Sequence, residues 1–404
     1  MELGLLIIMA CALIYALLAK RLSSSVVTAP MIFLGIGFVL STTGIMHQGD
    51  AEEILHIVAE VALIILLFID ASQTDITKLR ENHAWPTRML LIGLPLSVLI
   101  GTGVTMLLYP EWSIFAVALV AAILAPTDAA LGQAVVSNPA VPSDERRTLT
   151  VESGLNDGLA LPIVLFFACT LATMEGEHQG NFLIFTLEQL ILGPIIGWVV
   201  GWLGASLMLR ASNLDLTEPL YEGVAAIALA IIAFIGASLA GGNGFISAFV
   251  AGLAFGSVLK DHVEYVYEFA ESEGQILIWS SFLLLGVALL PEALAHLDWR
   301  MFGLILLSLF VVRPAAIWLS LIGSDAKPLT RLFFGWFGPR GLATALFALL
   351  IVGDINDAYA DVVLAVAINA VWISALLHGI TAAPGAKWYG GKQQAAAQDT
   401  QPEP

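Results

Sequence analysis

Polar and acidic side chains occur inside two stretches of this chain that are otherwise apolar. Pro126, Thr127 and Asp128 follow an Ala-Ala-Ile-Leu-Ala run, and Glu-Ser-Gly-Leu-Asn-Asp-Gly occupies residues 152–158. A charge at the centre of a bilayer costs about 2.5–3.5 kcal/mol on insertion scales, so acids in such stretches face a cavity or a partner. Oxygen groups without cysteine or histidine suit a hard monovalent cation or a proton. These residues therefore predict an ion-binding site within a membrane.

The spacing within the second stretch brings its polar residues together on a helix. Ser153 and Asp157 are four residues apart, as are Glu152 and Asn156. Side chains at this spacing lie on one helical face, and these two faces adjoin. Hydrogen bonding between helices is the alternative role, but it accounts for Ser153 and Asn156 and not for the acids. We therefore expect Ser153 and Asp157 to share one ion with Asp128.

Two prolines interrupt apolar segments. Pro126 removes a backbone donor, so we expect its helix to unwind around residues 125–127. The sequence Phe-Gly-Pro-Arg-Gly at residues 337–341 predicts a second interrupted helix. Unwound backbone at membrane depth is tolerated only where it is buried or lines a cavity, and interrupted helices are typical of secondary transporters. The two interruptions are therefore expected beside the ion site.

The second interruption also carries a buried positive charge. Arg340 cannot lose its proton in practice, so a buried acid should neutralise it. We assign Glu152 to this pair, which leaves Asp128 and Asp157 to exchange ligands. For Arg313, which lies in another apolar segment, a structural role at a helix end and a functional role both remain open.

The elements that position these residues are membrane-spanning helices. Of the 404 residues 58% are hydrophobic and 12% are charged, whereas soluble domains average about 25% charged. Apolar segments of about 20 residues recur, and each suffices to cross a hydrocarbon core of about 30 Å as a helix. We predict an all-α polytopic membrane protein. Its thirteen spans are 2–19, 25–45, 54–72, 89–108, 113–137, 148–174, 182–210, 218–240, 244–259, 276–295, 300–322, 332–352 and 360–383.

The domain organisation follows from the positions of the two breaks. With the seventh span as a linker, spans 1–6 and 8–13 become inverted repeats whose fifth and twelfth spans carry matching interruptions. We expect one transmembrane domain over residues 1–383 and a short cytoplasmic tail over 384–404. The core spans are expected at 89–174 and 300–383, and the scaffold or dimerisation spans at 2–72 and 182–295.

Basic residues predict the orientation. Thirteen of the sixteen lysines and arginines fall in loops on one side of a thirteen-span chain, and only Arg300 falls in a loop on the other. Because cytoplasmic loops carry the excess of basic residues, the N-terminus is expected outside and the C-terminus inside. The thirteen residues are Lys20, Arg21, Lys78, Arg80, Arg88, Arg146, Arg147, Arg210, Lys260, Lys327, Arg331, Lys387 and Lys392.

Several function classes are disfavoured by composition and motifs. The net charge is −17 and no basic stripe is present, which argues against a nucleic-acid partner. Cys11 and Cys169 lie within predicted spans and form no disulfide framework. No metal-ligand spacing of histidines, phosphate-binding glycine loop or nucleophilic serine motif occurs. We expect no cofactor.

Taken together, the Pro-Thr-Asp stretch at 126–128, the motif at 152–158 and Gly-Pro-Arg-Gly at 338–341 resemble monovalent cation:proton antiporters. The resemblance is to the NhaP-type branch, which is related to the eukaryotic Na⁺/H⁺ exchangers. It extends over essentially the whole chain in span count, orientation and motif order.

The resemblance implies roles for individual residues. Thr127, Asp128, Ser153 and Asp157 correspond to the family's site for the transported Na⁺. Asp70 matches an acid that the family places late in its third span. The resemblance also implies that Glu152 and Arg340 are the family's buried ion pair. Asn156 before Asp157 resembles the electroneutral branch, in which one cation exchanges for one proton, and the family further implies a homodimer.

The expected function is exchange of a monovalent cation, Na⁺ in the first place, for H⁺, in pH and sodium homeostasis. Exchange of K⁺ for H⁺ and ion-coupled symport of a solute are the alternatives, since oxygen ligands accept several cations. An ion channel lacks support because no filter sequence is visible. An intramembrane aspartyl protease lacks its Gly-x-Gly-Asp pattern. We expect a non-enzymatic protein of a bacterial inner membrane, in contact with lipid.

Overall fold

The computed structural model describes residues 2–22, 27–73, 84–174, 182–259 and 264–398, and every regular element in these ranges is a helix. Lys78, Arg80 and Lys260, which enter the orientation argument, lie outside the described residues. In chain order the helices are α1 (Glu2–Leu22), α2 (Ala29–Thr42), α3 (Gln48–Ser72), α5 (Ala84–Arg88), η1 (Met89–Gly93), α6 (Leu94–Leu108), α7 (Ile114–Ile123), α8 (Ala129–Val136), α9 (Ser143–Met174), α10 (Phe182–Asn213), α11 (Pro219–Leu239), α12 (Gly244–Leu259), α13 (Glu264–Ala288), α14 (Leu290–Ala295), α15 (Trp299–Leu307), η3 (Ser308–Val312), α16 (Arg313–Ser320), α17 (Pro328–Trp336), α18 (Leu342–Ile351) and α19 (Asp357–Gln398).

The all-helical, membrane-spanning class predicted from composition is confirmed. Seven helical stretches in the described part of the chain are long and apolar enough to cross a membrane. They are 51–72, 84–108, 143–173, 188–213, 220–239, 299–320 and 357–395. Shorter apolar helices accompany them, among them α2, α7, α12 and α18.

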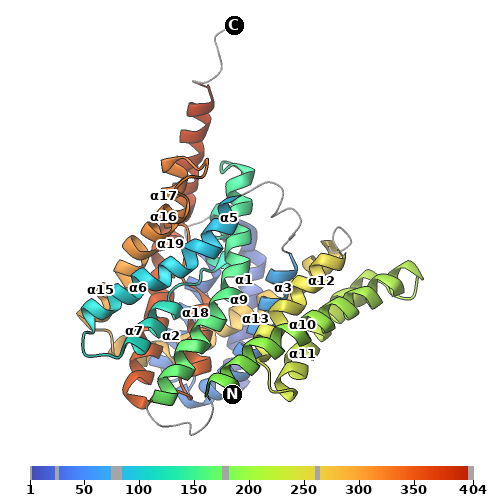
Figure 1. Cartoon of the computed structure of the whole chain (residues 1–404), viewed down its shortest axis with the longest axis horizontal. Helices are drawn as coiled ribbons and strands as arrows, with labels where there is room; N and C mark the ends of the chain where they lie inside the picture. The colour runs from blue at the N-terminus through green and yellow to red at the C-terminus, as the bar shows by residue number, and fades with distance from the viewer. Residues whose placement is uncertain (1, 23–26, 74–83, 175–181, 260–263, 399–404) are drawn as a thin grey trace.

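The helices form two groups joined by central helices. In Figure 1, α10, α11 and α12 gather on one side and α6, α15, α16 and α17 on the other, and the helices within each group pack on one another. Close backbone approach holds the first group together and joins it to the centre. A Cβ on Gly197 of α10 would lie 2.2 Å from the Ser247 carbonyl oxygen of α12, within the group. A Cβ on Gly252 of α12 would lie 2.2 Å from the Phe68 carbonyl oxygen of α3, a central helix. Such small residues let membrane helices approach closely.

Two helices share an unusual irregularity. The π-helical segments η1 and η3 are each five residues long, and Pro95 and Pro314 follow each of them at the same distance. The bond at the end of each segment runs five residues back, from Leu94 to Met89 and from Arg313 to Ser308. Since proline lacks a donor and its ring crowds the preceding turn, a widened turn relieves the helix at that point. These stretches, 84–108 and 299–320, are therefore built alike.

Two further helices are interrupted where the sequence predicts it. Helical geometry ends at Ile123 and resumes at Ala129, and it ends again at Trp336 and resumes at Leu342. Pro126 and Pro339 lie within the extended segments between them. Each interruption separates two short helices and leaves backbone groups that need partners from elsewhere in the fold.

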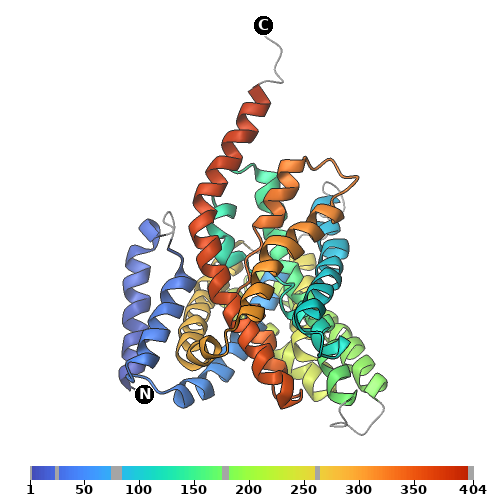
Figure 2. The ribbon, with the colours of Figure 1, turned by 90° about the vertical axis from the view of Figure 1, so that its left-hand side faces the viewer.

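The last helix extends further than its apolar sequence indicates. Helix α19 was expected to end near residue 383, but it continues through Pro384 to Gln398. Tyr389 explains the extension, because its buried ring stacks on Phe333 with centroids 3.9 Å apart and its hydroxyl donates to Glu145 Oε1 at 2.8 Å. In both views this end of α19 projects beyond the other helices, opposite to the start of α1 (Figures 1 and 2).

Candidate functional site

The two interrupted helices meet each other at Asp128. The Asp128 backbone N–H donates to the carbonyl oxygen of Pro339 at 2.9 Å, and its Oδ2 accepts from the Leu342 N–H at 2.9 Å. A Cβ on Gly341 would lie only 1.7 Å from Asp128 Oδ2. The absence of a side chain at Gly341 therefore allows this carboxylate to reach the N-terminal end of α18, where helix N–H groups lack internal partners.

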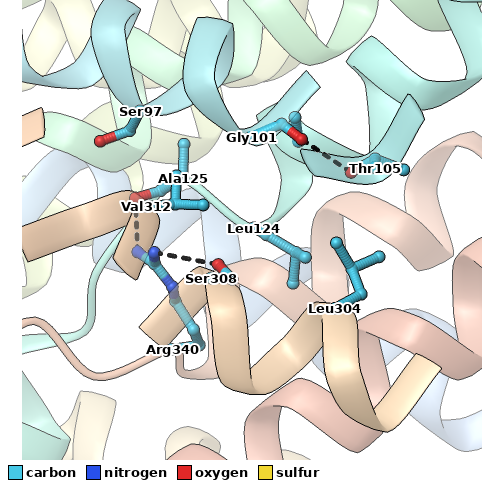
Figure 3. A pocket seen from close by; sticks show the side chains of 10 residues that line it. Ser97, Gly101, Thr105, Leu124, Ala125, Leu304, Ser308, Val312 and Arg340 are labelled. Carbon is cyan, nitrogen blue, oxygen red and sulfur yellow. Dashed lines mark hydrogen bonds between the residues drawn. The ribbon is translucent and has the colours of Figure 1, made fainter. Parts of the chain in front are cut away.

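Arg340 lies in the second interruption and binds the backbone of the first. Its Nη1 donates to the carbonyl oxygens of Ala125 and Pro126 at 2.7 and 2.9 Å, and its Nη2 lies 3.5 Å from Ser308 Oγ (Figure 3). The side chain is buried, beside a small cavity that Ser97 also lines. A guanidinium at the C-terminal end of α7 satisfies carbonyls that the break leaves unpaired, and its charge opposes the helix dipole there favourably.

The predicted pairing of Glu152 with Arg340 is wrong, because the ion-pair partner of Glu152 is Arg313. Arg313 Nη1 donates to Glu152 Oε1 at 3.0 Å and its Nη2 donates to Oε2 at 3.1 Å, with both side chains buried. This two-pronged geometry is the strong form of an arginine–carboxylate contact. A Cβ on Gly338 would lie 1.7 Å from Arg313 Nε, so Gly338 provides the space for this arginine.

Polar residues of α9 form hydrogen bonds with Thr127 in the first interruption. Ser153 Oγ donates to the Thr127 carbonyl oxygen at 2.7 Å, and Thr127 Oγ1 donates to Glu152 Oε2 at 3.3 Å. Asn156 Nδ2 donates to Thr127 Oγ1. The four-residue spacing thus brings Glu152 and Asn156 to the same threonine, as their shared helical face requires.

Asp157 offers an oxygen that no donor in the described part of the chain occupies. Its Oδ1 is buried and has no hydrogen-bond partner there, and the same holds for Asn156 Oδ1. Asp157 lies close enough to Asp128, Asp70 and Glu152 for their charges to interact with its own. These oxygens are of the type that binds a hard cation or takes up a proton.

Asp70 joins the site from α3. A Cβ on Gly154 of α9 would lie 3.4 Å from the Asp70 carbonyl oxygen and 3.5 Å from its Cβ, so the end of α3 packs directly on the motif at 152–158. Asp70, Asp128, Glu152 and Asp157 together outnumber the two buried arginines. An excess of buried carboxylates over guanidinium groups favours a cation or protons at the site.

Sequence reasoning left the role of Arg313 open, although the signal for it was present. Arg313 is a charge inside an apolar segment, as Arg340 is, and such charges mark functional positions. Ser308 and Ser374, which contact Arg340, carried no comparable signal because single serines are common in membrane helices.

Comparison with known proteins places the chain among related sequences. The family model described as "Sodium/hydrogen exchanger, transmembrane" matches residues 6–388. The K(+)/H(+) antiporter NhaP of Alkalimonas amylolytica is 26% identical over 384 residues, which is 92% of this chain and 64% of that protein. The K(+)/H(+) antiporter NhaP2 of Shewanella sp. (strain ANA-3) is 27% identical over 331 residues, 79% of this chain and 55% of that protein. The chain thus spans between about half and two thirds of the length of these relatives.

The fold is also found among solved structures. The structure of the sodium proton antiporter MjNhaP1 from Methanocaldococcus jannaschii at pH 8 matches with a TM-score of 0.79 and 21% identity, over 97% of each chain. At this identity the likeness shows a shared fold over almost the whole chain.

Proposed function

The chain belongs to the sodium/hydrogen exchanger family, and we propose that it is a secondary transporter, not an enzyme, that exchanges a monovalent cation for a proton. The observation that carries the proposal is Asp157, whose buried Oδ1 has no donor in the described part of the chain. Asp157 also lies near enough to Asp128, Asp70 and Glu152 for their charges to interact. A carboxylate in that position binds either a cation or a proton, and each excludes the other.

The proposed cycle is a competition at one centre. Asp157 is the chief exchanging group, and Asp128, Thr127 and Ser153 provide the remaining oxygens for the cation. Asp70 adds negative charge from α3. An occupied site is neutralised and moves across the membrane, whereas an empty site carries uncompensated charge that is expensive to move through an apolar environment. The flux of cation and the flux of protons are coupled for this reason.

The supporting parts of the site have separate tasks in this proposal. Glu152 and Arg313 form a paired, buried unit that fixes α9 against α16. Arg340 fixes the two interruptions to each other. Asn156, as a neutral neighbour of Asp157, leaves one fewer titrating group, which agrees with exchange of one cation for one proton.

The membrane topology proposed here has thirteen spans with the N-terminus outside. The matched π-helical segments η1 and η3 support inverted repeats, because they fall in the fourth span and in the eleventh, seven spans later. The two interruptions, in the fifth and the twelfth span, are also seven spans apart. We propose that the core spans at 89–174 and 300–383 move against the scaffold spans at 2–72 and 182–295, in a homodimer embedded in lipid of a bacterial inner membrane.

The transported cation is the finer part of the proposal. Na⁺ is proposed first, and K⁺ is the competing candidate because two relatives are named as K⁺/H⁺ antiporters. Oxygen ligands accept Na⁺, Li⁺ and K⁺, and the size and rigidity of the cage discriminate among them. A direct comparison of the three ions decides between the candidates.

The test is transport by the purified chain in liposomes that contain a pH-sensitive dye. An outward proton gradient is imposed, and Na⁺, Li⁺ or K⁺ is added outside; exchange raises the internal pH. We expect a rise with at least one cation, and we expect Asp157→Asn to abolish it. In the Na⁺ and Li⁺ arms, a potassium/valinomycin voltage clamp should leave the initial rate unchanged if exchange is electroneutral.

A matched substitution controls for the loss of an acid as such. Asp361→Asn makes the same chemical change at an exposed position on α19, and it should exchange at the rate of the unmodified chain. No response with any cation would reject antiport and favour a solute symporter. Full exchange by Asp157→Asn would reject the assigned site.

A further inference from the structure

Ser374 and His378 on α19 join the two ends of the second interruption. The backbone N–H of Arg340, next to the start of α18, donates to Ser374 Oγ at 2.7 Å. His378 Nε2 lies 2.9 Å from the carbonyl oxygen of Trp336, the last residue of α17. Ser374 Oγ and His378 Nδ1 are 3.1 Å apart and close the chain of contacts. The pair is four residues apart on a helix and therefore shares one face.

In a neutral imidazole one nitrogen donates and the other accepts. With its hydrogen on Nε2, the ring donates to the Trp336 carbonyl oxygen. Nδ1 then accepts from the Ser374 hydroxyl, which itself accepts the Arg340 N–H. In this tautomer one ring connects the end of α17 to the start of α18.

The surroundings of His378 favour a neutral ring. The charged groups near it are Arg340, from the interruption, and Arg313, from α16. An imidazolium would be a third positive charge in this buried position, and burial and like charges both disfavour the charged form. His378 therefore acts as a neutral hydrogen-bonding link.

The segment that this pair holds reaches the candidate ion site on both sides. Arg340 donates from its side chain to the carbonyl groups of Ala125 and Pro126. Leu342, two residues further, donates its N–H to Asp128. A shift of the interruption would therefore displace the backbone that precedes Asp128 and remove a donor from its carboxylate.

We propose that His378 and Ser374 are positioning residues that hold residues 337–341 in the geometry Asp128 requires. The inference rests on the proposed function for its effect on transport. The competing explanation is that His378 merely fills the core, stacked on Trp336 at 5.0 Å between ring centroids. Under that explanation its substitution lowers stability without a specific effect at the interruption.

The first measurement does not depend on transport. Hydrogen–deuterium exchange of the full chain in detergent is followed in peptides that cover residues 337–342. His378→Ala and Ser374→Ala should exchange there at least about fivefold faster, since each loses a hydrogen bond of the interruption. His378→Gln keeps an N–H donor for the Trp336 carbonyl oxygen. It should therefore exchange over residues 337–342 at the rate of the unmodified chain.

The second measurement is cation/proton exchange in the liposome assay at pH 8. We expect His378→Ala to raise the apparent KM for the cation about fivefold or more, with a smaller effect on the maximal rate. His378→Gln, which keeps the donor to Trp336, should keep the KM of the unmodified chain.

A buried polar residue elsewhere on α19 controls for general destabilisation. Asn369 is buried and donates to the Ala293 carbonyl at 2.6 Å, away from the interruption. Asn369→Ala should change neither the deuterium exchange at 337–342 nor the apparent KM. If His378→Gln behaves like His378→Ala, or if Asn369→Ala gives the same effects as His378→Ala, the proposal is overturned. If the unmodified chain shows no antiport, the proposed function fails, while the deuterium measurement still decides whether the pair holds the interruption.

Discussion

The buried pair of Glu152 and Arg313 makes the most demanding prediction about how the site is held. We consider Glu152→Gln, Arg313→Met and the double variant that carries both changes. Each single change leaves one ionised partner in a buried position, because the side chains are 5% and 3% exposed. The double variant removes both charges and leaves two neutral side chains of similar size.

The geometry gives the expected size of the effect. Two hydrogen bonds of 3.0 and 3.1 Å join the groups, and breaking one partner of such a buried pair costs about 3–5 kcal/mol. Replacing both partners leaves no unpaired charge, so the double variant should lose much less than the sum of the single losses. We expect a coupling energy of about 2 kcal/mol or more from the double-mutant cycle.

The free energy of unfolding is measured in mixed detergent micelles for the four members of the cycle. A second cycle between Glu152→Gln and Arg340→Met serves as the control, since Arg340 bonds to the carbonyl groups of Ala125 and Pro126 instead. Its coupling energy should remain below about 1 kcal/mol. A larger coupling for Arg340 than for Arg313 would refute the assignment of the pair.

Two further substitutions test how the interruptions and the last helix are packed. Gly341→Ala places a methyl group 1.7 Å from Asp128 Oδ2, so the carboxylate must move and the apparent KM for the cation should rise by about tenfold or more in liposomes; Gly353→Ala, which meets no atom within 4 Å, should leave it unchanged. Tyr389→Phe removes the donor at 2.8 Å from buried Glu145, and the loss of about 1–3 kcal/mol should appear as faster deuterium exchange over residues 384–395 with no change over 357–370. If residues 384–395 exchange at the same rate in Tyr389→Phe as in the unmodified chain, the hydroxyl does not hold the end of α19.

Much of the site was readable from residue types and spacing. Proline removes a backbone donor wherever it occurs, so the interruptions around Pro126 and Pro339 follow from local chemistry. Helical spacing alone puts Glu152 and Asn156 on one face, and both contact Thr127 in the structure. The resemblance to monovalent cation:proton antiporters is likewise confirmed by the family match over residues 6–388.

Other features were beyond local chemistry. Hydropathy indicates where a helix leaves an apolar environment, but α19 continues because Tyr389 packs on α17 and α9, which are remote in the chain. The contact of Asp70 with α9 depends on how closely α3 approaches Gly154. The residues adjacent in sequence therefore predict neither the extension of α19 nor the contact of Asp70 with α9.

The sequence by itself determined that this protein is a helical membrane protein of the exchanger family, with acids and interrupted helices at its centre. The cost of burying a charge and the backbone donor that proline lacks are properties of single residues. Both can therefore be predicted from the sequence alone. Only the tertiary structure decided which buried charges meet. Arg313 and Arg340 carry the same group in equally apolar surroundings. The fold brings Arg313 of α16 within 3.0 Å of Glu152 on α9. Arg340 instead meets backbone carbonyls of the first interruption. An ion pair depends on distance in space, which the order of residues does not give.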